Sequence, residues 1–317
     1  MSNRRLMGLF NIFGKKKKEK EDVKAITVTA KETPAKKAAD DKPLPKEEAP
    51  ATTGIAVTTQ GTPATKAADM PLEKVTPKEV GTLDMVIAFD TTGSMADYIE
   101  DVRRQVVELI PILFNNNENM RLGIVAFGDY CDMESAYEYG KAYQVIQPTD
   151  NQNALIRFVR SSRDTSGGDH DEFYELVLKK IIDETPWREN ASKVIILISD
   201  DVPHPLGYRC MPYVKDNQID WRNEAKRAAA MGIRIDTVAI EYHKWYEELS
   251  AMTNGVSIPF HSSYKTARMI RAAAYARGSR EARSRFDMDY DRAMNDDDEE
   301  MKAIYKRYRR ERDDIEF

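Results

Sequence analysis

Short, uninterrupted apolar runs recur along the middle of this 317-residue chain and limit what it can fold into. The clearest are Met85–Phe89 (MVIAF) and Val194–Ile198 (VIILI). A strand in which every residue is apolar is expected to be buried on both faces, as in a parallel sheet covered by helices. The two runs therefore favour an α/β domain.

Stretches with helical spacing separate the apolar runs. In residues 95–114, for example, apolar side chains recur every three or four positions. Further strands are expected at Leu122–Phe127, Tyr143–Ile146, Ile235–Ile240 and Val256–Phe260, and helices at 152–160, 171–183, 221–231, 244–252 and from Tyr264 onward. The run at 143–146 follows its predecessor through a short loop, as in a hairpin. This order predicts a doubly wound, mostly parallel sheet with helices on both faces and ligands at the carboxyl ends of its strands.

Oxygen-bearing side chains follow the first predicted strand. Asp90, Thr92 and Ser94 place a carboxylate and two hydroxyls on alternate residues, at the turn into the first helix. A cluster of oxygen ligands suits a hard cation, above all Mg²⁺. Gly93 is expected to let the backbone turn sharply enough for the hydroxyls to converge. The segment therefore predicts part of a metal site.

Two further loops offer oxygen ligands to the same place. The strand at 194–198 is followed by Asp200 and Asp201, and Asp200 reaches the site if this strand lies beside the first. The loop Asp164–Glu172 (DTSGGDHDE) is rich in oxygen ligands and precedes a helix. Side chains after the first strand could instead only cap the first helix. Three loops in this order favour a metal site over a cap.

These motifs resemble the von Willebrand factor A family over about 200 residues. Its metal-ion-dependent adhesion site reads Asp-x-Ser/Thr-x-Ser after the first strand, which Asp90, Thr92 and Ser94 match in what looks like the bacterial form, Asp-x-Thr-Gly-Ser-Met. Asp200 matches the aspartate after the fourth strand. The resemblance implies a six-strand sheet and a bound Mg²⁺ or Mn²⁺ whose last coordination place takes a carboxylate from a partner protein.

The middle element of the adhesion site is a Thr or Asp from a later loop. The Gly-Gly-Asp of residues 167–169 is similar to the glycine-rich loop of the family and makes Asp169 the first choice for this ligand. Thr165 is the alternative. The resemblance thus implies a metal site of Asp90, Thr92, Ser94, Asp200 and one of these two residues.

Two classes of function are compatible with this site. The first is a Mg²⁺-dependent docking module that binds an Asp or Glu of a protein partner, in an assembly with an ATPase or kinase as the intracellular members of the family often have. The second is a phosphohydrolase with Asp90 as the nucleophile. Such an enzyme needs an acid/base aspartate two residues later, where this chain has Thr92. The sequence therefore favours docking without catalysis.

The predicted domain occupies residues 80–280 and follows a polar arm at 1–79. The arm is mainly Lys, Glu, Ala, Thr and Pro, which predicts disorder. Ile26–Asp40 is repeated as Ile55–Asp69 with 10 of 15 positions identical. The repeats are either a duplicated linker or strands that could add to the sheet edge of a partner. Residues 7–18 are either a solvated terminus or a weak foothold on an anionic membrane.

Residues 281–317 alternate basic and acidic blocks, which predicts a solvated tail or a charged helix that binds a partner or RNA. The net charge of −5 is mild and gives no nucleic-acid signal. With no apolar run of about 20 residues, no membrane span is expected. The apolar start ends in Lys15–Lys18 without a cleavage site for export, and the two cysteines fit a reducing cytosol. A cytoplasmic location is therefore expected.

Histidines and cysteines also follow the predicted strands. They form a rim around the expected Mg²⁺ site, which could hold a softer metal or a general base, but no zinc-finger spacing is present. The polar loops at this face could equally carry such residues without a site. The rim consists of Cys131, His170, His204, Cys210, His243 and His261.

Overall fold

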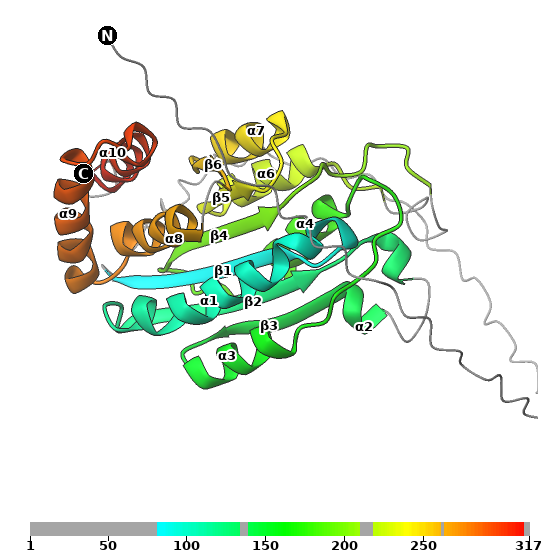
Figure 1. Ribbon diagram of the computed structural model, residues 1–317, viewed down its shortest axis with the longest axis horizontal. Coiled ribbons are helices and arrows are strands. Elements are labelled where there is room, and N and C mark those ends of the chain that lie inside the picture. Colours follow the sequence, from blue (N-terminus) through cyan, green and yellow to red (C-terminus); the bar gives the residue numbers. More distant parts are fainter. Residues whose placement is uncertain (1–80, 134–138, 210–217, 261–262, 314–317) are drawn as a thin grey trace, which may run out of the picture. The chain divides into compact units, whose positions relative to one another are not determined.

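The computed structural model describes residues 81–133, 139–209, 218–260 and 263–313. Within them a six-stranded sheet has the strand order β3-β2-β1-β4-β5-β6 (Figure 1). β3 runs antiparallel to β2, and the other neighbours are parallel. The predicted sheet is therefore confirmed, including the antiparallel pairing of its third strand, but residues 128–142, with η2 and α2, join β2 to β3 where a short loop was expected. The strands are β1 (Thr82–Asp90), β2 (Asn119–Phe127), β3 (Tyr143–Thr149), β4 (Ser192–Ser199), β5 (Ile233–Ala239) and β6 (Ser257–Pro259).

Helices connect the strands and follow the sheet. The first predicted helix is divided into the 3-10 turn η1 (Gly93–Asp97) and α1 (Ile99–Phe114). The remaining helices are η2 (Tyr130–Met133), α2 (Tyr139–Ala142), α3 (Gln152–Ser161), α4 (Tyr174–Glu184), α6 (Trp221–Ala230), α7 (Lys244–Met252), α8 (Ser263–Arg277), α9 (Arg280–Met294) and α10 (Glu299–Asp313). No helix in the described part of the chain is long and apolar enough to cross a membrane.

Strand β1 is buried on both faces, as its apolar run predicts. Met85, Ile87 and Phe89 belong to a core that contains residues of α1, α3 and α8. Val86 and Ala88 point to the other face, into a core with residues of α4, α6 and α7. Because side chains alternate along a strand, a strand between two helical layers must be apolar at every position. The two helical layers of Figure 1 correspond to these two cores.

The register of the central strands positions the candidate site. β1 and β4 are parallel neighbours, with Phe89 opposite Ile198. Asp90 ends β1, and Asp200 follows β4 directly after Ser199. The carboxyl ends of these two strands therefore bring the two aspartates to the same edge of the sheet.

Of the two alternatives for the C-terminal residues, the helical one is correct for residues 280–313 and the solvated tail is wrong there. They form α9 and α10, which contact α8 and each other. Both helices add buried apolar side chains to the core that contains α1 and α8. Their charged residues lie mainly on the opposite faces, so the high charge hid an amphipathic pattern. The buried side chains are Ala282, Phe286, Ala293, Met301, Ile304, Tyr305 and Tyr308.

A buried polar cluster joins α10 to β5. The guanidinium of Arg234 lies against the ring of Tyr308, 4.1 Å from its centroid, and pairs with Asp236 at 2.8 Å and with Glu311. The hydroxyl of Tyr308 donates to Asp236 Oδ2 at 3.0 Å. Arg234 is 2% exposed, so its charge depends on these partners. The last helix is therefore part of the folded domain.

The N-terminal arm lies outside the described residues. This includes the two repeats at 26–40 and 55–69 and the segment 7–18. The structure therefore leaves the predictions for the arm untested.

Candidate functional site

A chain of short hydrogen bonds links the three residues of the first loop. The hydroxyl of Thr92 donates to Asp90 Oδ1 at 2.7 Å, and the backbone N–H of Thr92 donates to the same oxygen at 2.8 Å. The hydroxyls of Thr92 and Ser94 are 3.1 Å apart. Asp90 and Thr92 are buried, whereas Ser94 is exposed. The predicted set of one carboxylate and two hydroxyls therefore converges and opens toward solvent at Ser94.

Asp200 and Tyr174 complete this group. The hydroxyl of Ser94 lies near Asp200 and lowers the pKa of its carboxyl, so the first loop and the loop after β4 meet here. The hydroxyl of Tyr174 lies 2.7 Å from Asp90 Oδ2 and 3.4 Å from Asp200 Oδ1. It also accepts the N–H of Asp201 at 3.2 Å. Tyr174 thus holds the two aspartates at a fixed spacing, a role that its sequence position did not indicate.

Glu172 also lies beside this group, although the sequence did not single it out as a ligand. It lies next to α4, is 3% exposed and lies beside Thr92, whose hydroxyl lowers the pKa of the glutamate. Its Oε2 is buried and has no hydrogen-bond partner in the described part of the chain. The backbone N–H of Glu172 donates to Val202 O at 2.9 Å, which ties the third loop to the loop after β4. A carboxylate oxygen that is buried beside Asp90 and lacks a donor fits a cation-binding group.

The electrostatics of the group also fit a cation. Burial and then the negative charge of Asp200 raise the pKa of Asp90 to about 7. Burial, followed by the charges of Asp90, Asp129 and Asp200, raises the pKa of Glu172 to about 11. Carboxylates crowded in a buried place disfavour ionisation unless a positive charge balances them. The donor set of carboxylates and hydroxyls matches the ligands of Mg²⁺.

The two candidates for the middle ligand lie elsewhere. Thr165 pairs with Thr91: its N–H donates to Thr91 O at 2.9 Å, and the two hydroxyls are 3.1 Å apart. Asp169 is exposed and accepts a hydrogen bond from the hydroxyl of Tyr208 at 2.8 Å. Of the third loop, the structure instead brings Glu172 into contact with Thr92. Of this loop, Glu172 is therefore the acidic residue beside the first loop in the structure, and the choice of metal ligand stays a prediction.

Gly93 serves a different purpose from the one expected. Its φ is not positive, so its backbone is not in the left-handed region. A Cβ at this position would lie 3.1 Å from the carbonyl oxygen of Ser166, whose position is fixed by a hydrogen bond from Gly93 N at 3.3 Å. Glycine therefore eases the close approach of the first and third loops, and a left-handed turn is not the reason.

The alternative in which the first loop only caps a helix receives little support. Thr92 is the N-cap of η1 and makes no side-chain capping bond. Tyr98, the N-cap of α1, makes none either. Asp90 accepts the N–H of Thr92, a local bond that would stabilise the turn with or without a cation. The hydroxyls of Thr92 and Ser94 point to Asp90 and Asp200 instead of to helix N–H groups.

The structure divides the rim residues. His204 Nε2 lies 2.8 Å from Asp129 Oδ1, and both side chains are buried. Burial lowers the pKa of His204, but the hydrogen bond and charge of Asp129 outweigh it and the net pKa is raised. His243 is 3.9 Å from Asp201, and His170 is exposed. Cys131 approaches Gly168. Cys210 and His261 lie outside the described residues.

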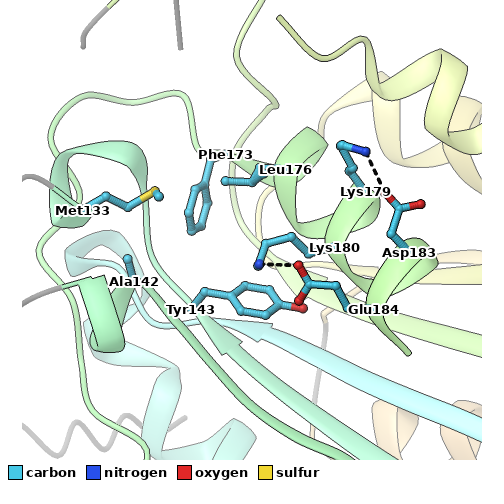
Figure 2. A pocket seen from close by; sticks show the side chains of 9 residues that line it. All are labelled: Met133, Ala142, Tyr143, Phe173, Leu176, Lys179, Lys180, Asp183 and Glu184. Carbon is cyan, nitrogen blue, oxygen red and sulfur yellow. Dashed lines mark hydrogen bonds and ion pairs between the residues drawn. The ribbon is translucent and has the colours of Figure 1, made fainter. Parts of the chain in front are cut away.

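A small pocket of about 120 Å³ lies between β3 and α4 (Figure 2). Its apolar wall includes Tyr143, Phe173 and Leu176. Its charged groups pair along α4, with Lys180 2.6 Å from Glu184 and an equivalent pair one residue earlier. None of the strand-end acidic residues lines it, so the pocket and the candidate metal site are separate.

Comparison with known proteins agrees with this geometry. The family profile described as von Willebrand factor type A domain matches residues 84–269, more than half of the chain. The chain belongs to this family. The matched residues contain all six strands apart from the first two residues of β1, and the strand-end loops of the candidate site. They end within α8, so α9 and α10 lie beyond the von Willebrand factor type A match.

The similar proteins of the family are much longer or only distantly alike. The ariadne-like RING finger protein R811 of Acanthamoeba polyphaga mimivirus is 21% identical over 57% of this chain and 18% of its own length. The alpha-protein kinase vwkA of Dictyostelium discoideum is 29% identical over 41% of this chain and 20% of its own. The chain therefore spans about a fifth of the length of these relatives. The structure of BatB from Bacteroides thetaiotaomicron, 14% identical, covers 59% of this chain and 95% of its own with a TM-score of 0.42.

Proposed function

We propose that this chain is a Mg²⁺-dependent docking module that binds a carboxylate of a protein partner. Asp90, Thr92, Ser94 and Asp200 hold the ion, and Glu172 takes the place that the sequence assigned to Asp169 or Thr165. The observation that carries the proposal is the convergence of three carboxylates and two hydroxyls from three loops at one sheet edge. Membership in an interaction-domain family supports it.

The balance of charges in the site favours an acidic partner. A divalent ion bound directly by all three carboxylates would have little attraction left for another anion. Two of the five residues are neutral hydroxyl ligands, which dilute the negative charge around the ion. A bound Mg²⁺ would therefore supply an electrophilic place for an Asp or Glu side chain. Mn²⁺ is expected to replace it.

Exposed apolar side chains follow the carboxyl ends of four strands in the sequence. Tyr98, Leu206, Tyr242 and Tyr264 are between 40% and 68% exposed. Each lies in the segment that follows the carboxyl end of a strand, β1, β4, β5 or β6 respectively. Large aromatic and apolar side chains around a polar centre are typical of binding hot spots. They support a protein partner over a small ligand.

The nature of the relatives guides the choice of partner. One of them is named an alpha-protein kinase and another a RING finger protein, and in both the matched part is about a fifth of the whole. Together with the expectations from the sequence, this makes a kinase- or ATPase-containing assembly in the cytoplasm the first place to search for the partner. No nucleic-acid partner is proposed.

The alternative function, a phosphohydrolase, requires an accessible nucleophile. Asp90 is fully buried, and both of its carboxylate oxygens accept hydrogen bonds, from Thr92 and from Tyr174. A nucleophilic carboxylate must instead reach the phosphorus atom of a substrate. Thr92, at the position of the acid/base residue, has no titratable group. The geometry therefore favours docking over phosphate hydrolysis.

A calorimetric titration of Mg²⁺ into the full chain tests the metal site. We expect binding to be lost in Asp90→Asn and weakened in Ser94→Ala. Asp201→Asn is the matched control, because Asp201 is the neighbour of Asp200 but donates no ligand in this proposal. Equal Mg²⁺ affinity in the wild type and Ser94→Ala would contradict the site. Capture of partners with and without chelator then tests docking, and a partner retained equally in chelator would place docking on another surface.

A further inference from the structure

Three rim residues form a second cluster beside the first site. Asp129 follows β2, Asp169 belongs to the loop before α4, and His204 follows β4. One ligand atom from each of the three lies within 4.8 Å of the other two, a spacing that a single metal ion can bridge. The cluster shares no residue with the group around Asp90. Its origin in three separate loops parallels that of the first site.

In its neutral form the histidine of this cluster has a nitrogen lone pair to offer in either tautomer, and a cation would bind in competition with the proton that Asp129 favours. His204 Nε2 lies 2.8 Å from Asp129 Oδ1, and Nδ1 is buried without a hydrogen-bond partner among the described residues. If Nε2 carries the proton, the lone pair of Nδ1 faces no donor. If Nδ1 carries it, the lone pair of Nε2 faces a carboxylate. The neutral ring is therefore suited to bind a cation, which would also remove the repulsion between the Nε2 lone pair and the Asp129 carboxylate.

Other groups hold the two carboxylates in place, as outer contacts do around metal ligands. The hydroxyl of Tyr208 donates to Asp169 Oδ2 at 2.8 Å, and the N–H of Cys131 donates to Asp129 Oδ2 at 3.3 Å. The ring of Tyr208 also stacks on His204, with centroids 3.8 Å apart and planes at 16°. One tyrosine thus orients two of the three candidate ligands.

A glycine brings the loop of Asp169 close enough. A Cβ on Gly168 would lie 2.1 Å from Cys131 Sγ, closer than any side chain tolerates. The loop before α4 therefore packs directly on the segment that carries Asp129. A larger residue at 168 would move Asp169 away from the other two.

We propose that Asp129, Asp169 and His204 form a second metal site, selective for a divalent transition metal and above all Zn²⁺. One imidazole and two carboxylates are ligands that Zn²⁺ accepts, and the two negative charges balance the ion. An imidazole ligand selects against Mg²⁺ and Ca²⁺, which prefer oxygen. Because Asp169 is exposed, the ion would be reached from solvent, and a fourth place remains for water or a partner side chain.

Zn²⁺ titrated by calorimetry into the full chain, with saturating Mg²⁺ and without an affinity tag, tests the proposal. We expect one Zn²⁺ per chain, with affinity reduced roughly tenfold or more in Asp169→Asn and His204→Gln. Asp169 is exposed, so its variant keeps the fold even if the buried histidine variant does not. His170→Gln is the matched control, because it removes an exposed histidine one residue from Asp169. Unchanged Zn²⁺ affinity is expected in this control.

The Asp90→Asn variant separates this proposal from the first. It removes a ligand of the proposed Mg²⁺ site and should leave Zn²⁺ binding intact, so either proposal can fail alone. Absence of saturable Zn²⁺ binding in the wild type would overturn the second site and leave His204 and Asp129 as an ordinary ion pair. The same conclusion would follow if Asp169→Asn bound Zn²⁺ as well as the wild type, or if Asp90→Asn abolished Zn²⁺ binding.

Discussion

Asp90→Asn should stabilise the metal-free protein at alkaline pH while abolishing Mg²⁺ binding. Asp90 is buried and close to Asp200, and its pKa is raised from 3.8 to about 7. Below about pH 4 its carboxyl is protonated in the folded and the unfolded states alike. Between about pH 4 and 7 the folded state keeps the proton that the unfolded state loses, so the free energy of unfolding falls as pH rises. Above about pH 7 the full cost of the buried charge remains.

The expected size of the effect follows from this pKa. A change from 3.8 to about 7 corresponds to roughly 4 kcal/mol, at about 1.4 kcal/mol per pKa unit. Asparagine can still accept from Thr92 through its carbonyl oxygen but places an N–H₂ group toward Tyr174. The tyrosine hydroxyl can then turn to Asp200, 3.4 Å away, so the rearrangement costs about 1 kcal/mol. In chelator at about pH 8, we therefore expect Asp90→Asn to be more stable than the wild type by about 2–3 kcal/mol.

Urea unfolding of the full chain in chelator, at about pH 8 and about pH 5, measures this difference. The advantage of Asp90→Asn should shrink at the lower pH, where the wild-type carboxyl is mostly protonated in the folded state. Excess Mg²⁺ should stabilise the wild type and leave the variant unchanged. Asp201→Asn, a half-buried neighbour, serves as the control. A variant less stable than the wild type at about pH 8, or an equal difference at both pH values, would refute the electrostatic argument and favour a structural role for Asp90.

Three further outcomes are expected. A chain of residues 71–280 should be less stable than one of residues 71–317 by about 3 kcal/mol or more, or should aggregate, because Arg234 loses its partners on α10. Equal melting temperatures of these two chains would contradict this. Gly168→Ala should weaken Zn²⁺ binding and leave Mg²⁺ binding unchanged, which titration of each metal will check. Tyr242→Ala should weaken binding of an isolated partner by about 1 kcal/mol or more without altering the melting temperature, and equal affinity would remove this side chain from the docking surface.

Much of the architecture could be predicted from local pattern. Apolar runs such as Met85–Phe89 predict a strand that is buried on both faces, because alternate residues pack against different helical layers. Helical spacing between these runs then predicts the order of elements, and the antiparallel pairing of β2 and β3 was expected as well. The motif of Asp90, Thr92 and Ser94 is local as well, since its residues are two positions apart and meet through short hydrogen bonds.

The prediction of a solvated C-terminal tail failed although the local pattern indicated a buried helix. Met301, Ile304, Tyr305 and Tyr308 have the spacing of a buried helical face, and this signal was present in the sequence. Most residues around these four are charged, and this composition is typical of a solvated segment. A helix needs only one apolar face to join a core, so overall charge does not determine whether it is buried.

What the sequence by itself determined is the sheet, its helical layers and the first loop of the candidate site, because these depend on the periodicity of neighbouring residues. Only the tertiary structure decided which acidic residue of the third loop lies beside Thr92. Asp169 and Glu172 are three positions apart, and no periodicity distinguishes their directions in an irregular loop. The contact of Gly168 with Cys131 directs Asp169 to His204, and the backbone bond of Glu172 to Val202 directs the glutamate to Thr92. Such directions are set by contacts between segments distant in the chain, which exist only once the sheet has formed.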